Sequence, residues 1–115
     1  MDLKARLEDL GYNILGIVTK GEEALKIIEE TKPDLILMDI IIKGELDGIK
    51  AAQIIKDNCK IPFIYLTAHY DNKTLERAQK TQPSAYLKKP YNDTEIQNAI
   101  ELALIDHQLK SKKPP

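Results

Sequence analysis

The chain has 115 residues, of which 43% are hydrophobic and 30% are charged, a size and composition suited to one domain with its own apolar core. Its 17 basic and 18 acidic residues nearly cancel, to a formal net charge of -1, so nothing indicates a nucleic-acid-binding surface or a solvating acidic tail. A single cysteine, Cys59, excludes an internal disulfide and is typical of a small packing residue in a reducing compartment. We expect a cytoplasmic protein, because no secretory signal opens the sequence and the longest apolar run is too short to span a bilayer.

The sequence opens with a helix pattern. Leucines recur at spacings of four and three within residues 3–10, and Gly11 follows as a stop signal. Residues 13–19 are rich in β-branched and other apolar side chains and end at Lys20 and Gly21, which predicts a strand followed by a turn.

The next two elements are a helix and the most apolar strand of the first half. Apolar spacing within residues 24–28 predicts a helix that ends before Pro33, because the residue before a proline resists the helical conformation. Residues 35–40 then surround one acid with large apolar side chains, which predicts a strand buried on both faces, as in a parallel sheet. Asp39 is expected at the carboxyl end of this strand, where open α/β sheets bind ligands.

The second half repeats the alternation. Asp47 is a candidate N-cap for a helix that Asn58 closes, and residues 63–67 form a second continuous apolar strand that ends on a polar residue, Thr67.

Four further segments complete the pattern. Residues 73–81 predict a short polar helix, and residues 84–88 predict a last short strand. An N-capping cluster at residues 92–94 precedes a long helix to about Leu109, and residues 110–115 are a basic, proline-containing tail or linker. Helices alternate with strands throughout, so the fold class is α/β with a mostly parallel sheet.

The long last helix carries apolar residues on two opposite sides. One stripe is expected to dock on the sheet, whereas the other lacks an obvious partner and predicts self-association of the chain. The docking stripe is Ile96, Ala99, Ile100, Ala103 and Leu104, and the free stripe is Leu102, Ile105 and Leu109.

Polar side chains follow three consecutive strands, as Asp39, Thr67 and Lys89. Right-handed crossovers bring these ends to one edge of a parallel sheet, where a carboxylate, a hydroxyl and an ammonium group suit the handling of a phosphoryl group. Each residue alone is better explained as an ordinary turn, strand or surface residue. Their joint occurrence on successive strand ends favours a common site.

Four stretches of the sequence resemble the response-regulator receiver domain of two-component signalling, a phosphoacceptor domain. They cover nearly the whole chain and are Pro33–Ile40, Asp47–Ile49, Tyr65–Ala68 and Ala85–Tyr91. The resemblance implies a flavodoxin-like doubly wound parallel sheet in three layers, with the strand order 2-1-3-4-5.

The resemblance also implies residue roles for the phosphoryl site. Asp39 would be the phosphoacceptor, and the carbonyl oxygen of Ile41 would join Asp39 in binding Mg²⁺. Lys89 would pair with the phosphoryl oxygens and precede a cis Pro90, whereas Lys88 would be a bystander.

Two further residues would form the switch that reports phosphorylation. Thr67 would supply a hydroxyl to the phosphoryl group, and the ring of Tyr86 would enter the space that this hydroxyl vacates. A module of this kind signals through partners rather than by turning over a substrate, so we do not expect an enzyme.

The sequence departs from the family at its start. Receivers begin with a strand that ends in two acidic residues holding Mg²⁺, and this strand and its acidic pair precede the helix on which these 115 residues open. The missing strand is the centre of the family's sheet, so we expect the sequence to be a fragment, with residues 1–109 an N-terminally truncated receiver and an incomplete Mg²⁺ site. Its loss would expose unpaired backbone groups, a second cause of self-association.

The favoured hypothesis is a phosphorelay receiver that takes a phosphoryl group on Asp39 from a histidine kinase or a phosphotransfer protein and switches partner binding. The alternative is a receiver-like interaction module that works without phosphorylation. Either would serve an output domain elsewhere, contact neither nucleic acid nor membrane itself, and form homodimers.

Overall fold

The computed structural model describes residues 3–18, 21–39, 48–58, 60–67 and 72–111, and within them helices alternate with short strands. None of the described helices combines the length and the apolar character that a membrane span needs. The elements in chain order are α1 (Leu3–Asp9), α2 (Gly21–Thr31), β1 (Ile36–Asp39), α3 (Gly48–Asn58), β2 (Phe63–Thr67), α4 (Asn72–Lys80), β3 (Ala85–Lys88) and α5 (Asp93–Ser111).

The described strands form one parallel sheet in the order β1-β2-β3. In the ladder, Ile36 pairs with Phe63 and Ile64 pairs with Ala85, so β2 is hydrogen bonded on both sides. All five residues of β2 are buried, as expected for a strand with neighbours on both edges and helices on both faces.

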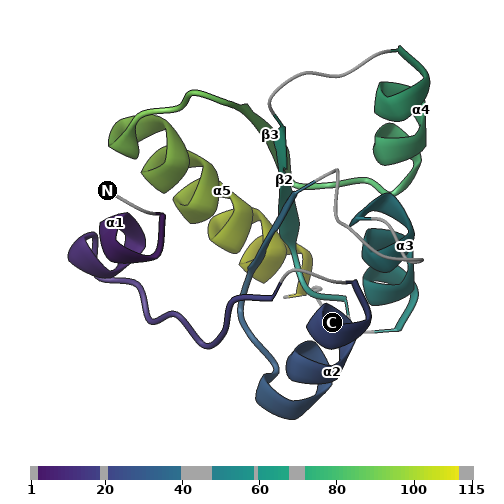
Figure 1. The fold of residues 1–115 in the computed structure, drawn as a ribbon, viewed down its shortest axis with the longest axis horizontal. Coiled ribbons are helices and arrows are strands. Elements are labelled where there is room, and N and C mark those ends of the chain that lie inside the picture. Colours follow the sequence, from purple (N-terminus) through teal and green to yellow (C-terminus); the bar gives the residue numbers. More distant parts are fainter. Residues whose placement is uncertain (1–2, 19–20, 40–47, 59, 68–71, 112–115) are drawn as a thin grey trace.

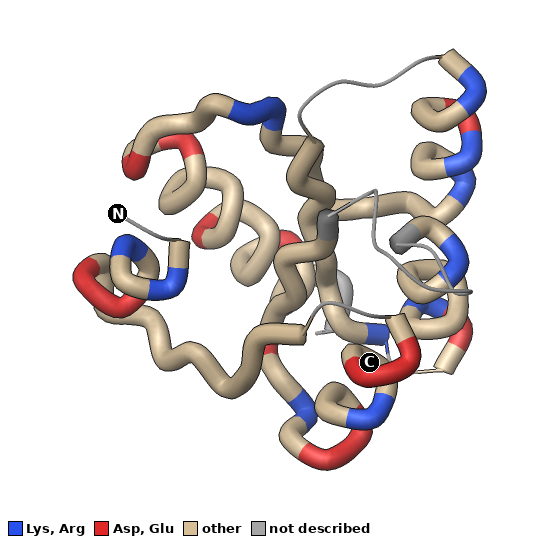
Figure 2. The backbone as a smooth tube through the Cα atoms, viewed as in Figure 1, with Lys and Arg blue, Asp and Glu red and all other residues tan. Residues whose placement is uncertain are grey.

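Helices cover the two faces of this sheet, which gives three layers (Figure 1). On one face, Phe63 and Tyr65 of β2 pack with residues of α2, α3 and α4. On the other face, Ile64 and Leu66 pack with α1 and α5. Charged residues of both signs are interspersed over the helices, whereas β2 carries none (Figure 2). The prediction of a doubly wound, flavodoxin-like parallel sheet is confirmed.

The predicted strand at residues 13–19 is wrong as far as the structure describes it, because residues 12–18 belong to no helix or strand. In the family's strand order, this segment would pair with the family's first strand, and among the described residues no strand lies beside it. A strand is stable only when its backbone groups have partners, so high β-propensity alone did not make one here. The segment instead packs Tyr12 and Ile14 into the α1/α5 layer and leaves Leu15 and Ile17 exposed.

The prediction that residues 35–40 are buried on both faces is also wrong for most of the described part. Met38 is buried, but Leu35, Ile36 and Leu37 are only half-buried. The cause is position, since β1 lies at the edge of the described sheet and β2 lies in its middle.

Local capping explains where two helices end or begin. Gly11 has a φ of 99°, and after α1 the Gly11 and Tyr12 amides donate to the carbonyls of Glu8 and Leu7, which is the Schellman arrangement. At the start of α5, Asn92 Oδ1 accepts from the Glu95 amide at 2.7 Å, as the N-capping cluster predicted. Helix α5 continues to Ser111, two residues beyond the predicted end.

Candidate functional site

Polar residues end or directly follow the three described strands at the carboxyl edge of the sheet. Asp39, the last residue of β1, pairs with Leu66, and Thr67, the last residue of β2, pairs with Lys88. The Lys89 amide then donates to the Thr67 carbonyl oxygen at 2.7 Å, which ties the ends of β2 and β3 together. Neighbouring strands lie about 4.8 Å apart, so the backbones of Asp39, Thr67 and Lys89 meet at one edge.

The surroundings of these residues differ in exposure. Thr67 is 2% exposed, so its side chain lies within the protein at the end of the central strand. Lys89 is exposed to solvent, and the peptide bond between Lys89 and Pro90 is cis. For Asp39 the structure describes the backbone, which lies at the end of β1. Ile41 lies outside the described residues.

Tyr86 lies on β3, two residues before Lys88, and is half-buried. Its ring centroid is 5.8 Å from that of Tyr65, and its hydroxyl donates to Gln79 Oε1 of α4 at 2.9 Å. Burial raises the pKa of the Tyr86 phenol above its usual value. The side chain therefore bridges the sheet and α4, with its hydroxyl directed to the helix.

Sequence reasoning missed a buried hydrogen-bonded chain beside Tyr86. Thr81 Oγ1 donates to the Ala78 carbonyl oxygen at 2.6 Å, and the Tyr65 and Thr81 hydroxyl oxygens are 2.6 Å apart. Because the Thr81 hydroxyl has a single proton, Tyr65 is the donor in their contact. The signal that could have predicted it is Tyr65 itself, since a tyrosine within a continuous apolar strand needs a partner for its hydroxyl.

The described residues do not by themselves fit a magnesium site. Mg²⁺ needs several oxygen ligands in near-octahedral geometry. Among the residues that the structure describes, no three Asp, Glu, His or Cys side chains are grouped so that they could hold a metal ion. The ligands expected within this chain are Asp39 and the Ile41 carbonyl oxygen. Of these, the structure describes only the backbone position of Asp39 on β1.

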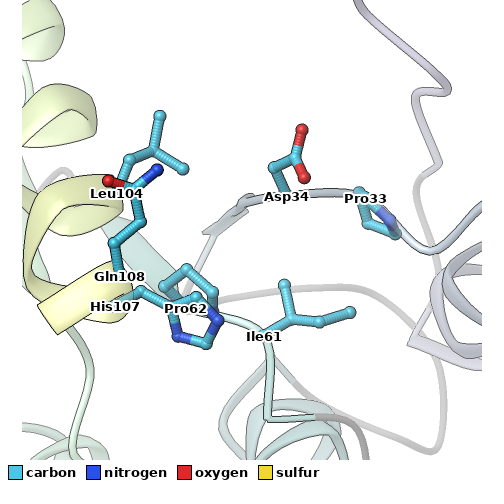
Figure 3. A pocket seen from close by; sticks show the side chains of 7 residues that line it. All are labelled: Pro33, Asp34, Ile61, Pro62, Leu104, His107 and Gln108. Atoms are coloured by element: carbon cyan, nitrogen blue, oxygen red, sulfur yellow. The ribbon is translucent and has the colours of Figure 1, made fainter. Parts of the chain in front are cut away.

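A pocket of about 330 Å³ lies at the opposite end of the strands (Figure 3). It is formed by the loops that lead into β1 and β2 and by one face of α5, and it is separate from the carboxyl edge where Asp39 lies. Its lining residues are Pro33, Asp34, Ile61, Pro62, Leu104, His107 and Gln108.

Comparison with known sequences gives one consistent result. The family model of the response regulator receiver domain matches residues 1–101. The transcriptional regulatory protein PdtaR of Mycobacterium tuberculosis is 39% identical over 104 residues, which cover 90% of this chain and 50% of that protein. The phyllosphere-induced regulator PhyR of Methylorubrum extorquens is 33% identical over 109 residues, which cover 94% of this chain and 40% of that protein. The chain thus spans half or less of these relatives.

Solved structures agree with the sequence relatives. The signal receiver domain of a modulated diguanylate cyclase from Desulfovibrio desulfuricans G20, described as an example of alternate folding, superposes with a TM-score of 0.90 at 36% identity. The match covers 94% of this chain and 86% of that one. The N-terminal domain of a response regulator/sensory box/GGDEF protein from Carboxydothermus hydrogenoformans gives a TM-score of 0.86 at 27% identity, over 96% of this chain and 88% of that one.

Proposed function

The chain belongs to the response regulator receiver domain family of two-component signalling, and from this membership we propose that Asp39 accepts a phosphoryl group from a histidine kinase or a phosphotransfer protein. A carboxylate oxygen of Asp39 forms the new bond to phosphorus while the bond between phosphorus and the donor's imidazole nitrogen breaks. The imidazole leaves with that electron pair and takes up a proton. The observation that carries the proposal is the alignment of Asp39, Thr67 and Lys89 at one sheet edge.

Thr67 and Lys89 would act on the phosphoryl group once it is bound. The Lys89 ammonium would neutralise charge on its oxygens, and the Thr67 hydroxyl would donate a hydrogen bond to one of them. The hydrogen bond from the Lys89 amide to the Thr67 carbonyl supports this arrangement, because it fixes the backbones of the two residues relative to each other.

Replacement of the acceptor carboxylate tests this assignment. The chain would be incubated with acetyl phosphate and Mg²⁺ and its intact mass measured. We expect only a small fraction of the chain to gain the mass of one phosphoryl group, because the expected Mg²⁺ site is incomplete. Asp39→Asn should abolish this gain because an amide is not a nucleophile for phosphorus. Asp34→Asn is the matched control, since Asp34 is an exposed acid just before the amino end of the same strand. Labelling that survives Asp39→Asn would exclude Asp39 as the acceptor.

We propose that phosphorylation is transmitted through Thr67 and Tyr86. If the Thr67 hydroxyl turns toward the phosphoryl group, the Tyr86 ring moves inward and its bond to Gln79 breaks. Thr67→Ala should therefore leave labelling of Asp39 largely intact but remove its effect on partner binding, whereas Thr67→Ser keeps the hydroxyl and should preserve it. Normal coupling in Thr67→Ala would locate the switch elsewhere.

A second candidate function is partner binding without phosphorylation. It would need neither bound Mg²⁺ nor a reactive carboxylate. In that case the chain stays unlabelled with acetyl phosphate, and Asp39→Asn binds the partner with unchanged affinity.

We propose that the chain's partners are a phosphodonor protein and an output domain in the same or another polypeptide, with residues 1–109 as the receiver and residues 110–115 as a tail. PdtaR of Mycobacterium tuberculosis and ZraR of Escherichia coli are both named transcriptional regulatory proteins. The match to this chain covers 50% of the length of PdtaR and 25% of the length of ZraR. The near-neutral charge of the chain supports assigning any contact with DNA to the output domain. A second copy of the chain is a further candidate partner.

A further inference from the structure

Arg6 of α1 makes three contacts with the segment that leads from β3 into α5. Its Nε donates to Asp93 Oδ1 at 2.7 Å, its Nη2 donates to the Tyr91 carbonyl oxygen at 3.2 Å, and its Cζ lies 5.5 Å from the centroid of the Tyr91 ring. The Arg6 side chain is only 22% exposed, and α1 lies beside the first turns of α5 (Figure 1). One guanidinium thus holds two residues of this segment.

The segment begins at Lys89, the residue assigned above to the phosphoryl group. Residues 89–92 belong to no helix or strand, so their positions depend on individual contacts. At the front, the Lys89 amide donates to the Thr67 carbonyl oxygen at 2.7 Å. At the back, the Asn92 side chain caps α5. Tyr91 lies between these two points, so the Arg6 contacts restrain the middle of the segment.

Pro90 makes the segment stiff between Lys89 and Tyr91. The ring of a proline fixes its φ near about −65°, and the residue before a proline is also restricted. Rotation about these bonds therefore absorbs little of a shift in Tyr91. A displacement of Tyr91 passes through Pro90 to the backbone of Lys89.

We propose that Arg6 is a positioning residue for Lys89: through Tyr91 and Asp93 it keeps the Lys89 ammonium where it can neutralise a phosphoryl group on Asp39. This role rests on the function proposed above for Asp39 and Lys89. Arg6 itself does not touch the phosphoryl group, since its guanidinium donates to Tyr91 and Asp93. A lysine side chain is long and flexible, so a fixed backbone limits the positions that its ammonium samples and favours the productive one.

The shape of the Arg6 side chain matters for this role, in addition to its charge. Its Nε and Nη2 donors lie in one plane and bind two different acceptors, a carboxylate and a backbone carbonyl. A lysine keeps the charge but presents a point-like ammonium on a flexible stem. Arg6→Lys therefore separates the holding of the segment from a simple gain of positive charge.

Amide hydrogen exchange followed by NMR tests the hold on Lys89 without a phosphodonor. Arg6→Ala should speed exchange of the Lys89 amide by roughly threefold or more, because its bond to the Thr67 carbonyl opens more often. The Ser84 amide is the reference, since it donates to the Phe63 carbonyl oxygen at 2.9 Å at the other end of the same two strands, and it should keep its rate. An unchanged Lys89 amide, or equal acceleration of both amides, overturns the proposal.

The initial rate of labelling by radioactive acetyl phosphate with Mg²⁺ tests the effect on the phosphoryl site. Arg6→Ala should slow labelling by roughly three- to tenfold, and Arg6→Lys should remain slower than the wild type. Lys4→Ala is the matched control, because it removes one positive charge from an exposed position of the same helix, and it should label at the wild-type rate. Full recovery in Arg6→Lys, or an equal loss in Lys4→Ala, would show that only charge matters and overturns the proposal.

A double-mutant cycle with Lys89 distinguishes positioning from a general loss of structure. If Arg6 acts through Lys89, Arg6→Ala should not slow labelling further in the Lys89→Ala background, whereas independent effects would multiply. Independent effects overturn the proposal. Absence of labelling in the wild type would reject the function proposed for Asp39, and with it any effect of Arg6 on that site. Labelling of the wild type together with an unchanged rate in Arg6→Ala would reject only the role of Arg6.

Discussion

The Tyr65 hydroxyl is a buried polar group that is hydrogen bonded to Thr81, in the turn after α4. It donates to Thr81 Oγ1, which donates to the Ala78 carbonyl oxygen. We predict that Thr81→Val lowers the free energy of unfolding by about 1–3 kcal/mol, the usual cost of removing a hydrogen-bond partner from a buried hydroxyl. Urea denaturation measures the change.

A double-mutant cycle separates this effect from a loss of packing. Tyr65→Phe in the Thr81→Val background removes the hydroxyl that has lost its Thr81 partner, so the double variant should be more stable than Thr81→Val alone. If the effects of the two substitutions simply add, the contact between the two hydroxyls contributes nothing to stability.

Tyr12 provides a pH-dependent contact between the segment after α1 and α5. Burial, the hydrogen bond to Glu101 and the charge of that carboxylate raise the pKa of Tyr12 above its usual value of about 10.0. The folded state therefore holds the phenolic proton more tightly than the unfolded state. Its stabilising effect is fully present below about pH 10 and is lost as the pH rises through the folded-state pKa.

We predict that Tyr12→Phe reduces the loss of stability above about pH 10. Glu101→Gln should lower the pKa of Tyr12 without returning it to the usual value, because burial is the largest cause of the shift. Ultraviolet difference titration of the folded protein follows tyrosine ionisation directly. The difference between the wild-type and Tyr12→Phe curves is the titration of Tyr12 itself, and a midpoint at or below about pH 10 would contradict the raised pKa.

At the scale of single elements, Asn92 determines where α5 starts. Its side chain accepts a hydrogen bond from the Glu95 amide, one of the amides at a helix start that lack partners within the helix. Asn92→Ala should lower the free energy of unfolding by about 1 kcal/mol. Asn98→Ala, an exposed position within the same helix, is the control and should have little effect or a slightly stabilising one. Equal losses from both would mean that the cap is not formed.

Elements with a pattern and a local signal could be predicted from the sequence, and elements that depend on a distant partner could not. The helix stop at Gly11 and the cap at Asn92 are local, and both were found. Residues 13–19 and residues 63–67 have similar β-rich compositions, but in the part of the chain that the structure describes only the second segment lies between two strands. The difference lies in the neighbours of a segment, which its own residues do not encode.

The same division applies to the candidate site. The order of Asp39, Thr67 and Lys89 on successive strand ends follows from the alternation of elements, so their common edge could be predicted. The Tyr65–Thr81 chain could not, because it depends on how α4 is placed against β2. The edge position of β1 could not be predicted from its apolar composition either.

At the scale of the whole molecule, β2 is the centre of the described sheet and β1 is its edge. Successive residues of a strand in a parallel sheet direct their amides alternately to the strands on its two sides. The Ile36 amide donates to the carbonyl of Pro62, the residue just before β2, so it points toward β2. The Leu37 amide therefore faces away from β2. We predict by hydrogen exchange that the β2 amides exchange slowest and that Leu37 exchanges faster than Ile36 and Met38. Slow exchange at Leu37 would mean that β1 has a partner on its outer side.

The contacts of α1 bear on how the protein is synthesised. Arg6 and Asp93 are 87 positions apart in the chain, and the leucines of α1 pack in the layer that α5 completes. At about 5–20 residues per second on the ribosome, α1 waits roughly 4–17 s before its ion-pair partner is made. During that interval its apolar face is available to chaperones, and its docking is one of the last steps by which the nascent chain becomes native.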